Sequence, residues 1–224
     1  MQRRNFLYAA FAAVGLGGWY MTSQRGATLP EDLLAGPANA QTTDADVDTS
    51  SIVDMIAGNP DAKIEVIEYA SFTCPHCAAF HAGPFKKLKA DFIDTGKIKF
   101  IYREVYFDRF GLWASLLARC GGQEKFFGIA DLIYVGQSQW TRAGDPAAIV
   151  EELRKIGRLA GMDNDALEAC LQDGDMAKTL VAWYQENAEA DEIDSTPSFI
   201  INGKKYANMR YDEMKEIIET AIGS

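Results

Sequence analysis

The order of strand and helix patterns between residues 64 and 105 constrains the fold more than any other feature of this sequence. Ile64 to Tyr69 is a short run rich in β-branched residues, introduced by a turn signal at residues 58–61. Apolar residues then recur with helical spacing from Cys77 to about Asp94, and Lys97 to Val105 has the composition of a second strand. A helix between two neighbouring strands makes them parallel through a right-handed crossover. The sequence therefore predicts a β-α-β unit.

The rest of the chain is expected to be helical until a final hairpin. Five segments with helical spacing, separated by glycine and proline residues, lie around residues 111–121, 124–136, 146–160, 164–172 and 175–191. Two short strands, Ser198 to Ile201 and Lys204 to Tyr206, flank Asn202-Gly203, the strongest short hairpin signal. A closing helix is expected from Tyr211 to Ile222. We therefore expect an α/β fold whose order is β-α-β, an all-helical insertion, then β-β-α, over residues 51–108, 109–192 and 193–224.

The N-terminus has the pattern of an export signal. Arg3 and Arg4 precede an uncharged apolar stretch from Phe6 to Met21, and Arg-Arg-Asn-Phe-Leu resembles a twin-arginine signal. Residues 1–21 are therefore expected to be a signal sequence, or a membrane anchor if they are retained. Residues 22–50 are rich in small and polar residues without an apolar period, which predicts a flexible tether. The folded part is expected in the periplasm.

Charge and cysteine content narrow the possible classes of function. The 224 residues carry a formal net charge of −10, with acidic residues along the whole chain, which disfavours binding to nucleic acid. Four cysteines are present; Cys74 and Cys77 form a close pair, whereas Cys120 and Cys170 lie alone in predicted helices. An exported protein rarely keeps free thiols, so we expect a structural disulfide between Cys120 and Cys170. Two buried unpaired thiols are the alternative.

The segment Cys74-Pro75-His76-Cys77 has the features of a thiol–disulfide exchange site. Two thiols at this spacing at the start of a helix can close a small ring, and the helix N-terminus favours a thiolate at Cys74. A thiolate attacks a disulfide sulfur, and the second thiol, here Cys77, resolves the mixed disulfide. Pro75 starts the helix with a preset φ, and His76 can donate to the Cys74 thiolate or favour it electrostatically.

Three other chemistries use a Cys-x-x-Cys pair. A zinc site would need more ligands; His81 is a candidate third ligand, but no second close cysteine pair exists. Covalent haem attachment requires a histidine directly after the second cysteine, where this sequence has Ala78. An inert structural bridge would be strained in so small a ring at a helix start. No metal and no cofactor are therefore expected.

Three segments together resemble the DsbA family of periplasmic thiol oxidoreductases. They are residues 58–62, residues 68–73 before Cys-Pro-His-Cys at 74–77, and Ser-Thr-Pro-Ser-Phe at 195–199. The resemblance covers about residues 51–222. It implies a thioredoxin-like fold in which Cys74 is the nucleophile, Cys77 is buried and Pro197 follows a cis peptide bond.

The resemblance also gives roles to two residues outside the cysteine pair. Glu68 resembles the acid that thioredoxin-like proteins bury beneath the active site, where it could relay the Cys77 proton. A carboxylate at the sheet edge, paired with a lysine, is the alternative. Pro197 removes a donor from the strand it enters, which suits an edge that hydrogen-bonds an extended substrate chain.

The implied function is that of an oxidase which passes its Cys74–Cys77 disulfide to newly exported proteins. A membrane quinone reductase of the DsbB type would reoxidise it. Thr196 before Pro197 favours a disulfide isomerase or reductase, because the best-known oxidase of the family resembles Val-Pro there. Isomerases of the DsbC type carry a dimerisation domain before the thioredoxin fold, and residues 22–50 are too few and too polar to supply one. A non-catalytic factor that holds extended peptides beside Pro197 is the third hypothesis.

Overall fold

The structure is a computed structural model that describes residues 47–223. The predicted signal or anchor of residues 1–21 lies outside the described residues, as does most of the predicted tether of residues 22–50. Within residues 47–223, none of the helices combines the length and the apolar character that crossing a membrane requires.

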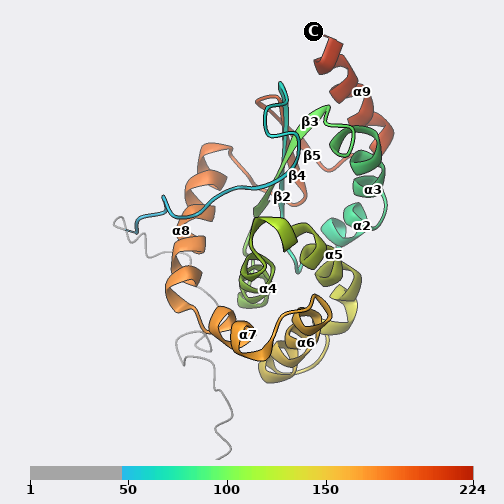
Figure 1. Ribbon diagram of the computed structural model, residues 1–224. Helices are drawn as coiled ribbons and strands as arrows, with labels where there is room; N and C mark the ends of the chain where they lie inside the picture. Colours follow the sequence, from blue (N-terminus) through green and yellow to red (C-terminus); the bar gives the residue numbers. More distant parts are fainter. Residues whose placement is uncertain (1–46, 224) are drawn as a thin grey trace, which may run out of the picture.

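A five-stranded sheet lies at the centre of the molecule (Figure 1). In the order β1-β3-β2-β4-β5, its strands are β1 (Met55–Gly58), β3 (Ile98–Glu104), β2 (Ile64–Ala70), β4 (Ser198–Ile201) and β5 (Lys204–Ala207). Strands β2 and β3 are parallel, and the other neighbouring pairs are antiparallel. The predicted β-α-β unit and the predicted final hairpin are both confirmed.

Strand β1 is absent from the sequence-based prediction, which begins the sheet at Ile64. It pairs with β3, with Met55 opposite Tyr102. Its four residues include a single β-branched one, so no strand pattern stands out. Burial of Met55 in the core and pairing with β3 stabilise the strand instead. It ends at Gly58, whose φ is +86° and where a Cβ would lie 2.6 Å from the Ile98 carbonyl oxygen.

The helix after β2 is broken where the sequence predicts a continuous one over residues 77–94. The structure has α2 (Pro75–Ala82), α3 (Pro84–Leu88) and the π-helical turn η1 (Lys89–Ile93). Gly83 leaves the helical conformation, with φ −133° and ψ −77°, and Pro84 begins α3 because it has no N–H to donate. The prediction of one helix is therefore wrong, and the two cysteines belong to a helix of eight residues.

Five helices form the predicted insertion between β3 and β4, which is confirmed. They are α4 (Arg109–Cys120), α5 (Gly122–Trp140), α6 (Pro146–Leu159), α7 (Asn164–Leu171) and α8 (Gly174–Ala190). An aspartate side chain caps the N-terminus of each helix except α5. Helix α5 continues past its predicted end at residue 136, because the buried Gln137 and Trp140 extend its inner face.

Helices cover both faces of the sheet. Figure 1 shows α2, α3 and the C-terminal helix α9 (Tyr211–Gly223) on one side and α8 on the other. Along β2, Val66 and Ala70 join the larger core, whereas Ile67 and Tyr69 join a smaller cluster beneath α8. Side chains alternate along a strand, so Glu68 points to the same side as Val66 and Ala70.

The hairpin of β4 and β5 brings the segment before β4 to the end of the sheet where the chain leaves β2. Asn202 and Gly203 have φ values of 48° and 80°, as a two-residue hairpin turn requires. Strand β4 pairs antiparallel with β2, with Ser198 opposite Tyr69. The Thr196–Pro197 segment therefore lies beyond the end of β2, which is also where the chain continues toward the cysteine pair.

Candidate active site

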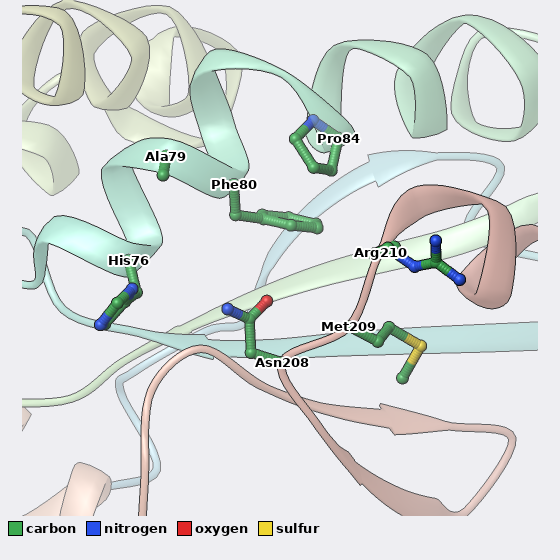
Figure 2. Close-up of a pocket in the computed structure, with 7 residues that line it drawn as sticks. All are labelled: His76, Ala79, Phe80, Pro84, Asn208, Met209 and Arg210. Atoms are coloured by element: carbon green, nitrogen blue, oxygen red, sulfur yellow. The ribbon is translucent and has the colours of Figure 1, made fainter.

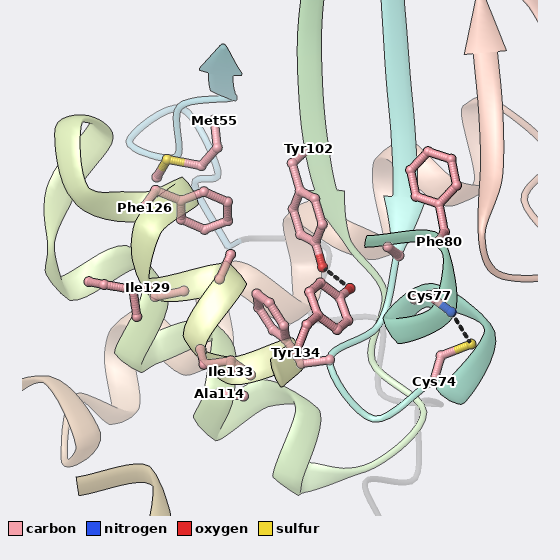
Figure 3. Packing of buried hydrophobic residues seen from close by; sticks show 14 of the residues in the cluster. Met55, Cys74, Cys77, Phe80, Tyr102, Ala114, Phe126, Ile129, Ile133 and Tyr134 are labelled. Atoms are coloured by element: carbon pink, nitrogen blue, oxygen red, sulfur yellow. Dashed lines mark hydrogen bonds between the residues drawn. The ribbon is translucent and has the colours of Figure 1, made fainter. Parts of the chain in front are cut away.

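Cys74 follows the loop after β2 and caps the N-terminus of α2 (Figure 3). The backbone N–H of Cys77 donates to the Cys74 sulfur at 3.4 Å, and the backbone N–H of Cys74 donates to the Ser71 carbonyl oxygen at 3.1 Å. Pro75 occupies the first helical turn. Both cysteines are free thiols; Cys74 is 7% exposed and Cys77 is 0% exposed. A reacting sulfur from outside can therefore reach Cys74 but not Cys77.

The surroundings of Cys74 favour its thiolate. The hydrogen bond from the Cys77 thiol lowers the pKa of Cys74 most. The Thr196 side chain and the backbone N–H groups of Cys77 and His76 lower it further, whereas partial burial of the sulfur raises it. Together they lower the pKa of Cys74 from 9.0 to about 5. The Thr196 carbonyl oxygen lies 3.5 Å from the sulfur and can accept a hydrogen bond only from the protonated thiol, so it favours the thiol over the thiolate. At pH 7 Cys74 is mostly ionised.

Cys77 has the opposite acidity. Burial is the largest cause that raises the pKa of Cys77. The hydrogen bond to Cys74 and the negative charge of Glu68 raise it further, so that it lies well above its ordinary value. Cys77 therefore keeps its proton at neutral pH. A thiolate beside a protonated thiol is the arrangement from which disulfide exchange starts.

The Thr196–Pro197 peptide bond, which the sequence resemblance implies to be cis, is cis in the structure. Pro197 is buried and Thr196 is half-buried beside Cys74. The segment thus presents backbone groups next to the reactive sulfur, where an extended chain could pair with them.

A groove of about 370 Å³ lies beside α2 (Figure 2). Phe80, Pro84 and Met209 give it an apolar lining, and its polar side chains are His76, Asn208 and Arg210. His76 is exposed, and among residues 47–223 no hydrogen bond joins its imidazole to Cys74; its backbone N–H is the group that acts there. A role for the His76 side chain stays a prediction.

Glu68 lies in the central strand β2, fully buried between β3 and β4. Its carboxylate oxygens lie 3.1 and 3.0 Å from Nε2 of His81 on α2. The alternative of a carboxylate at the sheet edge with a lysine partner is therefore wrong, because the strand is central and the partner is a histidine. The relay role predicted for Glu68 is not decided by this placement and stays a prediction.

Side chains from α5 and from the N-cap of α4 hydrogen-bond the loop before α2, and the sequence does not reveal these contacts. Gln137 of α5 donates from Nε2 to the carbonyl oxygens of Phe72 at 2.8 Å and of Cys74 at 2.9 Å. Asp108, which caps α4, accepts a hydrogen bond from the Thr73 hydroxyl at 2.8 Å. The one available signal for Gln137 is its position on the buried face of α5, between residues 133 and 140.

Cys120, the last residue of α4, forms a disulfide with Cys170 of α7, and their Cα atoms are 5.8 Å apart. His81, the candidate zinc ligand, contacts Glu68 instead. In the part of the chain that the structure describes, no three His, Cys, Asp or Glu side chains are grouped as a metal ion would require.

An ionised cysteine at a helix N-terminus and a buried second thiol one helical turn away define a thiol–disulfide exchange site at one end of this sheet. The chain belongs to the thioredoxin family, because the family model described as Thioredoxin matches residues 50–220. The predicted fold class, thioredoxin-like with a helical insertion, is confirmed.

The proteins similar to this chain are named as a protein-disulfide oxidoreductase, a DsbA protein and a protein-disulfide isomerase. A Rickettsia bellii protein, provisionally named a protein-disulfide oxidoreductase, is 38% identical over 170 residues, which are 75% of this chain and 64% of that protein. The crystal structure of Wolbachia pipientis alpha-DsbA1 is 28% identical with a TM-score of 0.69, over 76% of this chain and 91% of that one. A protein-disulfide isomerase from Novosphingobium aromaticivorans is 26% identical with a TM-score of 0.69, over 77% and 100%. The predicted resemblance to DsbA is confirmed.

Proposed function

We propose that this chain is an exported thiol:disulfide oxidoreductase that donates the Cys74–Cys77 disulfide to newly exported proteins. The observation that carries the proposal is the contrast between the two thiols. Cys74 keeps an exposed fraction of 7% and its pKa falls to about 5, whereas Cys77 is fully buried and keeps its proton. A disulfide that opens to a stabilised thiolate is a strong oxidant, because its dithiol form is the favoured product.

The exchange has two steps. A substrate thiolate attacks the Cys74 sulfur and forms a mixed disulfide; the Cys74–Cys77 bond breaks, and Cys77 leaves and takes up a proton. A second substrate thiolate attacks the substrate sulfur of the mixed disulfide, so that the substrate disulfide forms and Cys74 leaves as a thiolate. Two electrons pass from the substrate to the protein. A thiol of low pKa leaves faster, so the second step depends on the stabilised Cys74 thiolate.

The proposed substrates are unfolded or partly folded exported proteins with reduced cysteines. An extended substrate segment would pair with the backbone beside Thr196 and Pro197, where the Thr196 carbonyl oxygen lies 3.5 Å from the Cys74 sulfur. Apolar substrate side chains would enter the groove lined by Phe80 and Met209.

A periplasmic location and a recycling partner belong to the same proposal. The Arg3-Arg4 pair before an apolar stretch supports export. After each turnover the protein holds two electrons that it must pass on, and a membrane quinone reductase of the DsbB type is the proposed acceptor. Glu68, whose charge acts on Cys77, is the proposed relay for the Cys77 proton.

Disulfide isomerisation is the second candidate function. An isomerase acts from its dithiol form, so that the Cys74 thiolate attacks an incorrect disulfide and releases it in a new pairing. The hydrogen bond from the Thr196 side chain to Cys74 favours that thiolate. The isomerase from Novosphingobium aromaticivorans among the structural neighbours also supports this candidate.

The test mixes the oxidised full chain with a reduced peptide that contains two cysteines. We expect a peptide disulfide to form while two thiols appear on the protein, and Cys74→Ala to abolish the reaction. The dithiol protein is assayed in parallel on a substrate with scrambled disulfides; faster repair there than oxidation would favour isomerisation. A protein that fails to oxidise the peptide, yet suppresses aggregation equally well with Cys74→Ala, is a holding factor and contradicts the proposal.

A further inference from the structure

The groove beside α2 has a permanent positive charge at one end. In Figure 2, the His76 side chain lies at one end of the group of lining residues and Arg210 at the other, with the Phe80 ring between them. Pro84 and Met209 complete the apolar part of the lining. Among the described residues that line the groove, Arg210 is the one whose side chain is always charged. The groove therefore combines an apolar surface with a site for a negative group.

The Arg210 guanidinium has donors to offer to a ligand. Arg210 is exposed, and within residues 47–223 no hydrogen bond or ion pair joins its guanidinium to another side chain. Asp212 and Glu213 follow it in the first turn of α9, but neither pairs with it. Other arginines of this chain do pair with carboxylates; they are Arg103, Arg119 and Arg154. The fold thus leaves Arg210 free to bind an acidic group from outside.

The charges on the elements packed nearby do not cancel that of Arg210. The Lys87 amino group of α3 lies 5.5 Å from the centre of the Tyr211 ring, so a second cation lies close to the start of α9. Asp91 of η1 is already used, because it accepts hydrogen bonds from the Tyr211 hydroxyl and from Lys215. The whole chain has a net charge of −10, so a cation without a partner beside a groove is an exception on this molecule.

The groove is continuous with the reactive cysteine. His76, at one end of the groove, is two residues after Cys74 on the same helix. The Phe80 ring packs on the Phe199 ring of β4 at 4.8 Å, so the apolar part of the groove joins α2 to the strand that follows Pro197. A substrate segment whose cysteine is bonded to Cys74 can therefore continue along the groove toward Arg210.

We propose that Arg210 binds a carboxylate side chain of the substrate, so that the protein prefers cysteines with an aspartate or glutamate a few residues away. This inference rests on the proposed function and adds a substrate class to it. A guanidinium can hold a carboxylate by two parallel hydrogen bonds, and the apolar lining takes the substrate side chains in between. Arg210 does not touch the reacting sulfur atoms, so it determines specificity and takes no part in the exchange itself.

The test measures how fast the oxidised full chain oxidises reduced peptides that have amidated C-termini. The peptides differ at one position, which carries glutamate or glutamine and is moved within about five residues of a cysteine, a reach of about 17 Å. Each rate constant is divided by that of the same peptide with 2-hydroxyethyl disulfide, an uncharged oxidant, because a carboxylate also alters the peptide thiol. Exposed ion pairs are weak, so at low ionic strength we expect glutamate to be favoured about 2- to 5-fold at the best position.

Arg210→Gln should abolish the preference for glutamate, and Arg210→Lys, which keeps the charge, should retain part of it. Lys178→Gln is the matched control, because it removes the same charge from an exposed position on α8, on the other side of the sheet. We expect this variant to keep the native preference. An equal loss in Arg210→Gln and Lys178→Gln would assign the preference to the net charge of the molecule and would overturn the inference.

Charge reversal and the native protein give two further readouts. Arg210→Glu should favour a peptide with lysine over one with glutamate, whereas Lys178→Glu should not. In the native protein the preference for glutamate should shrink as salt is raised to about 1 M, because salt screens exposed charges. Equal rates for the glutamate and glutamine peptides at every position would overturn the inference while the proposed function stands. If the glutamine peptide is not oxidised at all, the proposed function itself fails.

Discussion

Thr196 acts on the Cys74 sulfur through two groups with opposite effects. Its side chain donates to the thiolate and lowers the pKa of Cys74, whereas its carbonyl oxygen, 3.5 Å from the sulfur, can accept only from the thiol. A different residue before Pro197 would therefore change the stability of the thiolate while both cysteines are kept. The backbone carbonyl is common to every residue type, so the side chain is the adjustable part.

Thr196→Val removes the hydroxyl and keeps the branched shape. A hydrogen bond to a charged group contributes about 1.5–3 kcal/mol, and one pKa unit corresponds to about 1.4 kcal/mol, so we expect the pKa of Cys74 to rise by roughly one unit or more. Titration of the ultraviolet absorbance of the thiolate measures it. Ser195→Ala, which alters a hydroxyl that bonds Ser198 instead, should leave the pKa of Cys74 unchanged. An unchanged pKa in Thr196→Val would mean that the hydroxyl does not stabilise the thiolate.

The residues that react are predictable from the sequence, whereas those that support them are not. Cys74 and Cys77 lie within one helical turn, so a short sequence pattern predicts their chemistry. His81 is 13 residues from Glu68, and Gln137 is 63 residues from Cys74, so only the folded chain brings each pair together. A histidine near two cysteines fits a zinc ligand as well as a carboxylate partner until its surroundings are known.

Helix α5 positions the loop that leads into α2. The Gln137 amide links α5 to the carbonyl oxygens of Phe72 and Cys74, and the Tyr134 hydroxyl, one turn earlier, donates to the Ser71 carbonyl oxygen at 3.3 Å. These contacts satisfy acceptors in a loop that makes a turn rather than a regular hydrogen-bonded element. The insertion therefore contributes directly to the position of the reactive sulfur.

Gln137→Ala and Gln139→Ala make a matched pair on this helix. Gln137 is buried and its loss leaves the Phe72 carbonyl oxygen without this donor, so we expect about 1–3 kcal/mol less stability in urea unfolding. Gln139 is exposed, and its hydrogen bond to Glu152 lies at the surface, so its change should stay within about 0.5 kcal/mol. Equal losses in the two variants would contradict the anchoring role of Gln137.

Element boundaries were predictable where caps and turns are local, and not where tertiary contacts decide. The Asn202-Gly203 turn and the helices that begin at an aspartate follow from local chemistry. Strand β1 depends on a neighbour more than 40 residues away in sequence, Met55 pairing with Tyr102. The break at Gly83 and Pro84 is visible in the sequence, but the apolar period that continues through Phe92 and Ile93 conceals it.

For the whole molecule, the Cys120–Cys170 disulfide connects α4 and α7 across 50 residues of the insertion. Closing a loop of this length restricts the unfolded chain, which stabilises the folded one by about 2–4 kcal/mol. We expect the double variant Cys120→Ala with Cys170→Ala to lose about that much in urea unfolding. The pKa of Cys74 should not change in this variant. A variant as stable as the native protein would contradict a structural role for the disulfide.

The acidity of Cys74 also makes the stability of the dithiol form depend on pH. Its pKa is about 5 in the folded protein against 9.0 as a free group, so its contribution is complete above pH 9 and is lost as pH falls through 5. Cys77, with its pKa raised, stays protonated in both states below pH 9 and adds no slope. Between pH 5 and pH 9 we expect the free energy of unfolding of the dithiol form to rise by up to about 1.4 kcal/mol per pH unit relative to that of the disulfide form. Urea unfolding of both forms measures the difference, and parallel curves would contradict it.

The ionisation of Cys74 is the claim on which the exchange chemistry depends most, and one titration tests it. The dithiol form of the full chain is titrated while the ultraviolet absorbance of the thiolate is followed, and Cys74→Ala provides the baseline. We expect a single transition with a midpoint near the pKa of about 5 that the Cys77 and Thr196 contacts give Cys74. A midpoint near the ordinary cysteine value of 9.0 would mean that these contacts do not stabilise the thiolate and would contradict the proposed mechanism.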